Sequence, residues 1–518
     1  MVSRISLRRK IARKSIKEGF RCYDKDTKLY YEYYYRIKFN KHIIAGKVQA
    51  RSIEHPEIWT GLIEKAPQPW CMDRDTAEPT AGGLPGPNAA EWIEFHSEHA
   101  APSEYSHEFV WDVTEEADGP FVTDVDGNVV LDFTCHIGAA PLGYNNDKLL
   151  DKLREFDLVE PMKIAGQDLY FGVGSDPESA ELPGSSHLMA KLCDVSSQYG
   201  MDTVFLSNSG AEAVENGMKI SYDNTPAAKY GITFEGSFHG RTLGTLSVTR
   251  SNEVYTRRYP EISGIRMVPF CRDRHCTAAS CDCGFFADGE SRLRALFDED
   301  GGHITPDEVA FLVMEPVQGV GGYRFPSSEF MSEVADVTSR YDIPLIVDEV
   351  QSGVGRTGEI WASDHYPIQP DVITSAKALR VGATISRSEI FPDEKNRLGS
   401  TFGGGDILSS MQGVFTLEAI EEHGLLDNAS TRGRQAKELL RDGSADHVVD
   451  VRGKGLMLAV EFDTPERRDS VVAESLRRGL LTLGCGEKTI RLLPPLDSTE
   501  REIDLGVGIF LDAIDAAA

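Results

Sequence analysis

The chain has 518 residues, of which 41% are hydrophobic and 26% are charged. At roughly 150 residues per domain this length predicts about three domains. This hydrophobic fraction is enough to fill large cores, which excludes a disordered, a collagen-like and a small disulfide-stabilised protein. No uncharged apolar run approaches the ~18 residues of a membrane-spanning helix, so we expect no membrane partner. Nine cysteines, an odd and clustered set, favour a reducing, cytoplasmic location over a disulfide framework.

Charge divides the chain into two unequal parts. The net charge is −28, yet residues 1–50 hold 14 basic and 4 acidic side chains. The remaining acidic and lysine-poor body resembles proteins adapted to high salt, with an ordinary acidic enzyme as the alternative. Nucleic acid is excluded as a main partner, because binding phosphates needs the opposite charge.

The basic opening does not match the rest of the chain. Its tyrosine-rich run at residues 30–35 has no counterpart elsewhere. We predict that residues 1–71 are an extension outside the fold and that the natural start is Met72. A targeting or binding arm is the alternative.

The middle of the chain predicts a sheet buried on both faces. Residues 109–133 first alternate apolar and polar positions around Asp126-Gly127, which predicts an antiparallel hairpin. Short apolar runs then alternate with helix-length stretches, a pattern typical of a parallel or mostly parallel sheet. In such sheets ligands bind at the carboxyl ends of the strands. These runs are residues 203–206, 311–314, 345–347 and 372–374.

The tail differs from the middle. Residues 451–462 and the pair of segments around Gly484-Cys485-Gly486 are predicted as strands. A final helix follows, with Thr499 and Glu502 as its capping box. Its apolar face is formed by Ile503, Val507, Phe510 and Ile514. We therefore predict an α/β fold with a large mostly parallel-sheet domain at residues 165–405. A smaller α+β domain is built from both chain ends, residues 72–164 and 406–518.

Three strand ends carry chemically notable residues. Ser209-Gly210-Ala211 follows the first apolar run, where a beginning helix can bind a phosphate through its free amides. Asp348 closes an apolar strand, and a buried carboxylate needs a cationic partner. Lys377 closes the next one, where loss of hydration would make its amine nucleophilic. Taken singly, each has an ordinary alternative: a plain helix start, a turn-capping carboxylate and a surface lysine.

Together these residues meet the needs of pyridoxal 5′-phosphate: a phosphate cradle, a lysine for the aldehyde and a carboxylate for the pyridine nitrogen. Over roughly residues 85–515 the sequence resembles the class III, fold-type-I aminotransferases that use this cofactor. Members include 4-aminobutyrate, ornithine, acetylornithine, lysine and alanine–glyoxylate enzymes. Seven motifs carry the resemblance: N-S-G-A-E-A (208–213), F-H-G-R-T (238–242), E-P-V-Q-G (315–319), D-E-V-Q-S-G (348–353), S-A-K (375–377), T-F-G-G (401–404) and R-G-K-G (452–455).

The resemblance implies a role for each motif. Lys377 would bind the cofactor covalently and carry the substrate proton, and Asp348 would pair with the ring nitrogen. Gln351 would hydrogen-bond the phenolic oxygen. Phe238 would stack on the ring with His239 beside it.

The remaining motif residues concern the phosphate and the strand ends. Gly210 and Ala211, next to Ser209, would bind the phosphate. Thr401 would reach the phosphate of a neighbouring subunit, which implies a homodimer. Glu315 would anchor its strand end, either beside the cofactor or as a purely structural carboxylate.

The chain departs from the family pattern in the substrate region. Many ornithine and 4-aminobutyrate enzymes have a glutamate where this chain has Val320, and that glutamate pairs with an arginine matching Arg491. A free Arg491 could bind a substrate carboxylate in both half-reactions. This disfavours those two specificities and admits an alanine–glyoxylate-like or β-amino-acid donor. A structural ion pair with another acid is the alternative for Arg491. By contrast, the compact segment 378–383 looks more like the 4-aminobutyrate and lysine branch.

A second departure is a cysteine cluster, Cys271, Cys276, Cys281 and Cys283, with His275 among them. Zinc or an iron–sulfur group would suit so many thiols, although the spacing is not that of a standard zinc finger. An unmetallated structural loop is the alternative.

The predicted activity is transfer of an amino group from an amino acid, with ω- and β-amino acids included, to a 2-oxo acid by a ping-pong mechanism. Within the same fold, a racemase or decarboxylase is the alternative, because Lys377 and Asp348 would serve all three chemistries. A binding protein that lost its activity is disfavoured by the intact Lys377, Asp348 and Gln351.

Overall fold

The computed structural model describes residues 72–103, 108–154, 166–167, 172, 176–178, 182–298, 304–399, 401–443 and 447–517. The predicted basic extension, residues 1–71, lies outside the described residues, so the predictions about it stay predictions. Among the helices that the structure describes, none is both long and apolar enough to cross a membrane.

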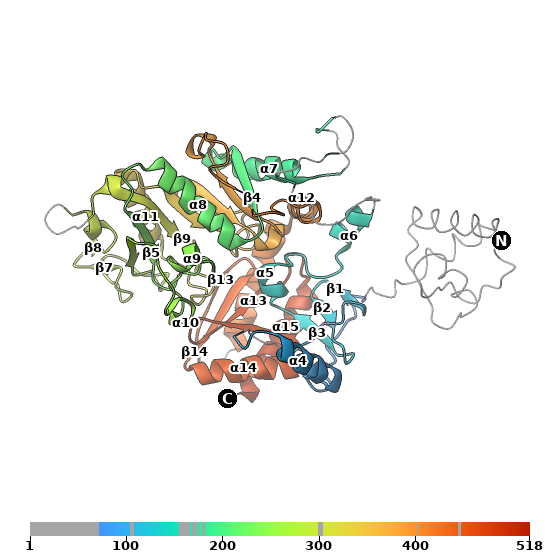
Figure 1. The fold of residues 1–518 in the computed structure, drawn as a ribbon. Helices are drawn as coiled ribbons and strands as arrows, with labels where there is room; N and C mark the ends of the chain where they lie inside the picture. Colours follow the sequence, from blue (N-terminus) through green and yellow to red (C-terminus); the bar gives the residue numbers. More distant parts are fainter. Residues whose placement is uncertain are drawn as a thin grey trace, which may run out of the picture.

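A seven-stranded sheet forms the centre of the larger body, with strand order β4-β12-β11-β10-β9-β5-β6 (Figure 1). All neighbouring strands are parallel except β12, which runs antiparallel to both β11 and β4. The four apolar runs of the sequence are confirmed as strands β4, β9, β10 and β11. The bounds are β4 Thr203–Ser207, β5 Tyr230–Phe234, β6 Ile265–Val268, β9 Val309–Met314, β10 Leu345–Asp348, β11 Val372–Ser375 and β12 Gly382–Ser386.

Helices cover both faces of this sheet. Successive strand side chains point to opposite faces, so Phe311 and Ile346 pack with α8 (Gly210–Asn224) while Leu312 and Leu345 pack with α11 (Ser328–Tyr341). Burial on two sides explains why these strands are continuously apolar. Other helices of this body are α7 Ser185–Asp194, α9 Leu243–Leu246, α10 Glu253–Thr256 and α12 Ile407–Glu422.

Two smaller sheets lie beside the large one. The first has the order β1-β2-β3-β15, and β15 (Leu480–Leu481) runs parallel to β3 (Val129–Asp132). The predicted hairpin around Asp126-Gly127 is confirmed, with Gly127 at a φ of 83° in the turn between β2 and β3. The second sheet has the order β13-β14-β17-β16 and is antiparallel throughout. Its strands are β13 Val448–Lys454, β14 Met457–Phe462, β16 Leu483–Cys485 and β17 Thr489–Leu492, while β1 is Ala117–Asp118 and β2 is Phe121–Thr123.

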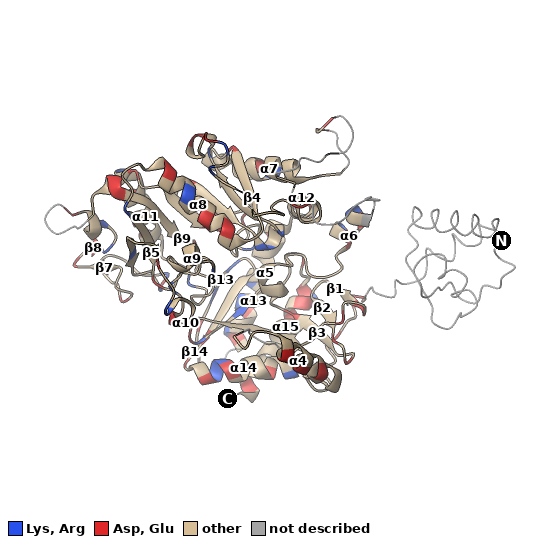
Figure 2. Cartoon of the chain, viewed as in Figure 1, with Lys and Arg blue, Asp and Glu red and all other residues tan. Residues whose placement is uncertain are grey.

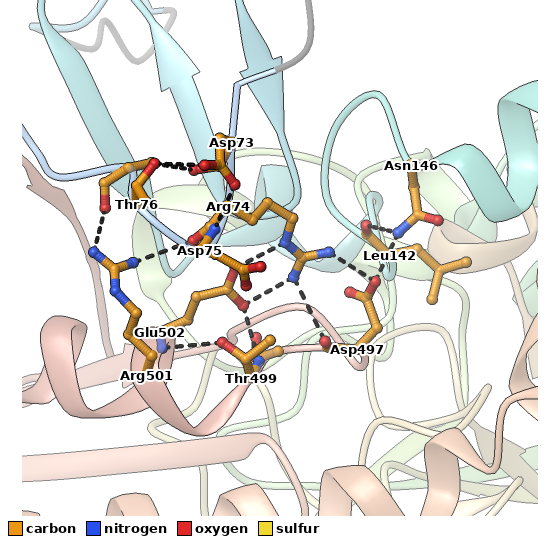
Figure 3. A network of polar contacts seen from close by, with 12 residues as sticks. Asp73, Arg74, Asp75, Thr76, Leu142, Asn146, Asp497, Thr499, Arg501 and Glu502 are labelled. Carbon is orange, nitrogen blue, oxygen red and sulfur yellow. Dashed lines mark hydrogen bonds and ion pairs between the residues drawn. The ribbon is translucent and has the colours of Figure 1, made fainter. Parts of the chain in front are cut away.

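Segments from both ends of the described chain gather in the lower part of the view (Figure 1). Figure 3 shows Arg74 reaching Asp497 and Glu502, with guanidinium–carboxylate distances of 3.0 and 2.8 Å. The predicted final helix is α15 (Glu500–Ala516), and its capping box of Thr499 and Glu502 is confirmed. The remaining elements are α4 Pro87–His99, α5 Cys135–Gly138, α6 Asp147–Arg154, α13 Leu425–Gly443, α14 Pro465–Arg477, β7 Phe286–Ala287 and β8 Glu290–Ser291.

The α/β fold class is thus confirmed, because a mostly parallel sheet stands between two helical layers. The predicted domain boundaries at residues 164/165 and 405/406 stay predictions.

Candidate active site

A cavity of about 440 Å³ opens at the carboxyl ends of the parallel strands. Asp348 at the end of β10 and the segments that follow β4, β5, β9 and β11 line it, as expected for ligand sites in open α/β sheets. The structure brings together nine of the predicted site residues here. They are Ser209, Gly210, Ala211, Phe238, His239, Glu315, Asp348, Gln351 and Lys377.

The first part of the cavity wall is the start of α8. Ser209 is the N-cap, and its hydroxyl accepts a hydrogen bond from the Glu212 amide at 3.2 Å. The first amides of a helix have no partner within the helix, and the helix dipole makes this end positive. Gly210 approaches Val350 so closely that a Cβ would stand 2.8 Å from a valine methyl group. The small residues therefore leave a cradle whose free amides suit a phosphate.

Asp348 lies at the end of β10 and is 5% exposed. One carboxylate oxygen is 2.8 Å from Nδ1 of His239, and the other accepts the Val350 amide at 3.0 Å. Nε2 of His239 is buried and makes no hydrogen bond among the described residues. A carboxylate held in this way is suited to keep a proton on a pyridine nitrogen.

Lys377 follows β11 and is half-buried in the cavity. Withdrawal from water lowers the pKa of its amine to about 7, and the positive charge of Arg491 acts in the same direction. Asp348 and Glu315 oppose this shift. A large fraction of the amine is therefore neutral near pH 7, which is the form that attacks a carbonyl group.

Glu315 connects two stretches of the cavity wall. Its carboxylate accepts the amides of Phe238 and Gly319 at 2.9 and 2.8 Å. Burial raises the pKa of Glu315 to about 7. The Phe238 ring packs edge-on against Tyr255, with ring centroids 5.8 Å apart. These contacts hold Phe238 in place at the wall.

Arg491 stands on β17 just behind the cavity lining and is 7% exposed. Its Nη1 donates to Oε1 of Gln351 at 3.3 Å, and its guanidinium lies 6.0 Å from the centre of the Tyr323 ring. Nε of Arg491 is buried without a hydrogen-bond partner, and no carboxylate pairs with this arginine in the part of the chain that the structure describes. Val320, at the position of the family glutamate, lines the cavity.

Thr401 lies outside the lining of this cavity and is exposed. Its hydroxyl donates to Glu212 at 2.6 Å and accepts from the side-chain amide of Asn208 at 2.9 Å. Asn208 lines the cavity, so within a single chain Thr401 is connected to the cavity wall through Asn208.

The sequence-based prediction missed lining residues contributed by turns, among them His136 and Arg380. His136 lies in α5, where Cys135, His136 and Ile137 all have positive φ. Asp132 steadies this turn by accepting the Thr134 amide and the Tyr144 hydroxyl, each at 2.6 Å. Bulky residues rarely adopt this backbone region, so no local signal identified the turn.

The pattern of residues fits pyridoxal 5′-phosphate. The cavity combines a helix start for the phosphate, an aromatic wall, a buried carboxylate and a lysine whose pKa is lowered. The cysteine cluster stands elsewhere, and none of its residues lines this cavity.

Comparisons with known proteins agree with this chemistry. The family model "Aminotransferase class-III" matches residues 103–514. The acetylornithine aminotransferase of Archaeoglobus fulgidus is 33% identical, over 82% of this chain and all of that protein. The Bacillus subtilis acetylornithine aminotransferase is 32% identical, over 78% and 95% of the two chains.

Solved structures show the same fold. A lysine aminotransferase from M. tuberculosis superposes with a TM-score of 0.70 at 25% identity, over 83% of this chain and all of that chain. An ornithine aminotransferase from Toxoplasma gondii has a TM-score of 0.68 at 22% identity, over 83% and 94% of the two chains, and supports the fold alone.

The predictions of a fold-type-I enzyme, of pyridoxal 5′-phosphate as cofactor and of amino-group transfer from an amino acid to a 2-oxo acid are confirmed. The chain belongs to the class III aminotransferase family.

Proposed function

We propose that Lys377 and Asp348 carry the amino-group transfer in this chain. The observation that supports this most strongly is their position at the ends of adjacent parallel strands, β11 and β10, on one cavity that also contains the start of α8. When bound, the cofactor's ring accepts the electrons left at the substrate α-carbon as its proton departs.

We propose the following roles for the residues that line the cavity. The Lys377 amine would hold the cofactor and would carry the proton that leaves the substrate α-carbon. Asp348, fixed by His239, would pair with the protonated ring nitrogen. Phe238 would pack against the ring, and Gln351, which accepts a hydrogen bond from Arg491, would hydrogen-bond the phenolic oxygen.

Replacement of Lys377 tests this proposal. We expect Lys377→Ala to lose the visible absorbance of the lysine-bound cofactor and to lower kcat by at least about 100-fold, as for loss of a general base. Lys395→Ala, at an exposed loop position, is the matched control and should keep both. If Lys377→Ala retained colour and turnover, the assignment of Lys377 would be wrong.

For the substrate, we propose a donor whose carboxylate binds Arg491, with the reacting amino group on the α- or β-carbon. The support is that Arg491 has no acidic partner among the described residues and that Val320 cannot supply one. An unneutralised arginine favours a carboxylate in both half-reactions. N-acetylornithine, from the names of the relatives, is the second candidate donor.

A donor screen with 2-oxoglutarate, pyruvate and glyoxylate as acceptors separates these candidates. We expect α- or β-amino acids to exceed ω-amino donors in kcat/KM, and Val320→Glu to raise the relative activity with ω-amino donors. Val320→Leu is the control that keeps the site apolar. High activity of the unchanged enzyme with ornithine or 4-aminobutyrate would contradict the argument from Val320 without affecting the role of Lys377.

We also propose that the enzyme works as a homodimer in the cytoplasm. Thr401 is exposed in a single chain, and next to it the Phe402 side chain is 70% exposed. A partner subunit would cover this segment and could receive Thr401 at its phosphate cradle. The described cysteines are all free thiols, which fits a reducing compartment. Light scattering should give twice the chain mass, and Phe402→Asp should shift the mass toward the monomer.

A further inference from the structure

The loop between β6 and β7 contains four cysteines that the catalytic chemistry does not use. The loop packs against the start of α11, where the Ala278 amide donates to Glu329 at 2.9 Å. Arg274, in the same loop, forms an ion pair with Asp450 of β13, with a guanidinium–carboxylate distance of 3.2 Å. The cysteines therefore occupy a defined place between an edge strand, a helix and the second sheet.

The thiols converge on one point. The sulfur atoms of Cys271, Cys276 and Cys283 all lie within 4.8 Å of one another. Sγ of Cys283 is 3.6 Å from Sγ of Cys276 and 3.2 Å from Sγ of Cys281. A tetrahedral zinc ion with Zn–S bonds of about 2.3 Å places its sulfur ligands roughly 3.8 Å apart. The Cys276–Cys283 separation of 3.6 Å is close to that value. Cys281 lies next to Cys283 but outside the group of three sulfurs, so its side chain would shift to become the fourth ligand.

A disulfide and an iron–sulfur cluster both fit this geometry less well than a single ion. A disulfide would use only two of the sulfurs, yet Cys283 contacts two different thiols, and all four cysteines are free. An iron–sulfur cluster places two or more iron atoms and its sulfides among the thiolates, so its cysteine sulfurs do not all gather at one point. Three thiols around one point with a fourth beside them fit the ligand set of a tetrahedral zinc site.

The surroundings suit bound thiolates. The Ser327 amide donates to Sγ of Cys271 at 3.5 Å, and the Phe286 amide donates to Sγ of Cys281 at 3.3 Å. Cys271 and Cys276 are buried in a core that also contains Phe270. Such N–H···S contacts and an apolar cover orient and protect metal ligands.

We propose that Cys271, Cys276, Cys281 and Cys283 bind one Zn²⁺ ion in a structural site. The thiols lose their protons to solvent as the four Zn–S bonds form, and no group is oxidised or reduced. The ion fastens the loop to the start of α11 at a distance from the cofactor cavity.

The metal content of the purified holoenzyme tests the proposal. The enzyme is produced in zinc-containing medium, purified without chelator and measured by elemental mass spectrometry, and we expect close to one zinc ion per chain. The variant Cys276→Ser with Cys283→Ser should contain almost none. Cys193→Ser, which removes a free thiol on α7 outside the cluster, is the matched control and should keep the zinc. The wild-type measurement decides the question even if the double variant does not fold.

X-ray absorption at the zinc edge gives the ligands. We expect four sulfur atoms at about 2.3 Å. Three sulfurs with one oxygen or nitrogen atom would overturn the part assigned to Cys281. Iron in place of zinc, a disulfide detected by the mass of the intact chain, or metal-free enzyme with four titratable thiols would each overturn the proposal.

Discussion

Arg491 and Lys377 influence each other across the wall of the cavity. Burial lowers the pKa of Lys377, and the positive charge of Arg491, which has no carboxylate partner among the described residues, lowers it further. Asp348 and Glu315 oppose this shift, so the pKa of Lys377 depends on its burial and on three neighbouring ionisable side chains. The presence of Lys377 and Asp348 could be predicted from their strand ends. The position of Arg491 beside Gln351 could not, because β17 reaches this place only through the tertiary fold.

This balance predicts a pH dependence. The rate at which the apoenzyme captures pyridoxal 5′-phosphate should rise through about pH 7 and then level off, because only the neutral amine attacks the aldehyde. Arg491→Gln should move the midpoint to higher pH, since the protonated lysine loses a repelling neighbour.

Stopped-flow absorbance of the apoenzyme across a pH series measures this midpoint. Arg491→Lys preserves the charge and serves as the control, with its midpoint near that of the wild type. An unchanged midpoint in Arg491→Gln would show that Arg491 does not set the pKa of Lys377.

At the scale of elements, helix ends and apolar strands could be predicted from the sequence, because they depend on residues that are close together in the chain. Ser209, Thr499 and Glu502 could be assigned because a cap is satisfied within one turn of its own helix. By contrast, β12 went unpredicted, because its antiparallel pairing with β4 and β11 joins segments that are distant in sequence. The left-handed turn at His136 also went unpredicted, although Asp132 holds it locally by accepting the amides of Thr134 and His136, because bulky residues rarely adopt this backbone region.

The capping box of α15 makes a quantitative prediction. In this box Glu502 donates its backbone amide to the Thr499 hydroxyl at 3.2 Å, and the Thr499 amide donates to the Glu502 carboxylate at 2.9 Å. Thr499→Ala should lower the free energy of unfolding by about 1 kcal/mol, because one helix amide loses its acceptor. Thr499→Ser keeps the hydroxyl and should stay close to the wild type. Urea unfolding followed by circular dichroism measures both, and equal loss in the two variants would contradict a hydrogen-bonding role.

At the scale of the whole molecule, the two ends of the described part of the chain are joined by buried polar contacts. Arg74 binds Asp497 and Glu502, which are 4% and 0% exposed in their side chains (Figure 3). Asp497 also accepts the Asn146 side-chain amide at 2.8 Å. These residues are as much as 428 positions apart in the chain, so no local pattern announces the pairing.

Replacement of Arg74 should therefore strongly lower the free energy of unfolding. Arg74→Ala leaves the buried Glu502 without a cation and Asp497 with Lys148 alone, and we expect a loss of about 3–5 kcal/mol in the free energy of unfolding. Lys191→Ala breaks a pair with the exposed Glu421 and should cost less than about 1 kcal/mol. Urea unfolding of both variants provides the comparison. Similar losses would mean that the Arg74 contacts do not hold the chain ends together.

The many acidic residues lead to a second prediction for the whole molecule. Figure 2 shows acidic residues on helices such as α4 and α8, and the net charge of the chain is −28. Because salt screens repulsion among carboxylates, the unfolding temperature should rise as potassium chloride is added up to molar concentration. Calorimetry in a salt series measures this. Highest stability at low salt would favour an ordinary acidic enzyme over one adapted to high salt.

The sequence by itself determined the alternation of apolar strands and helices, the strand ends that carry Asp348 and Lys377, and the cap of the last helix. Each depends on residues within a few positions of one another, where backbone periodicity and local hydrogen bonds act. Only the tertiary structure decided that His239 pairs with Asp348, that Arg491 has no acid beside it among the described residues, that three cysteine sulfurs meet, and that Arg74 reaches Asp497. Those contacts arise when remote segments are packed together, and their distances are set by the folded core.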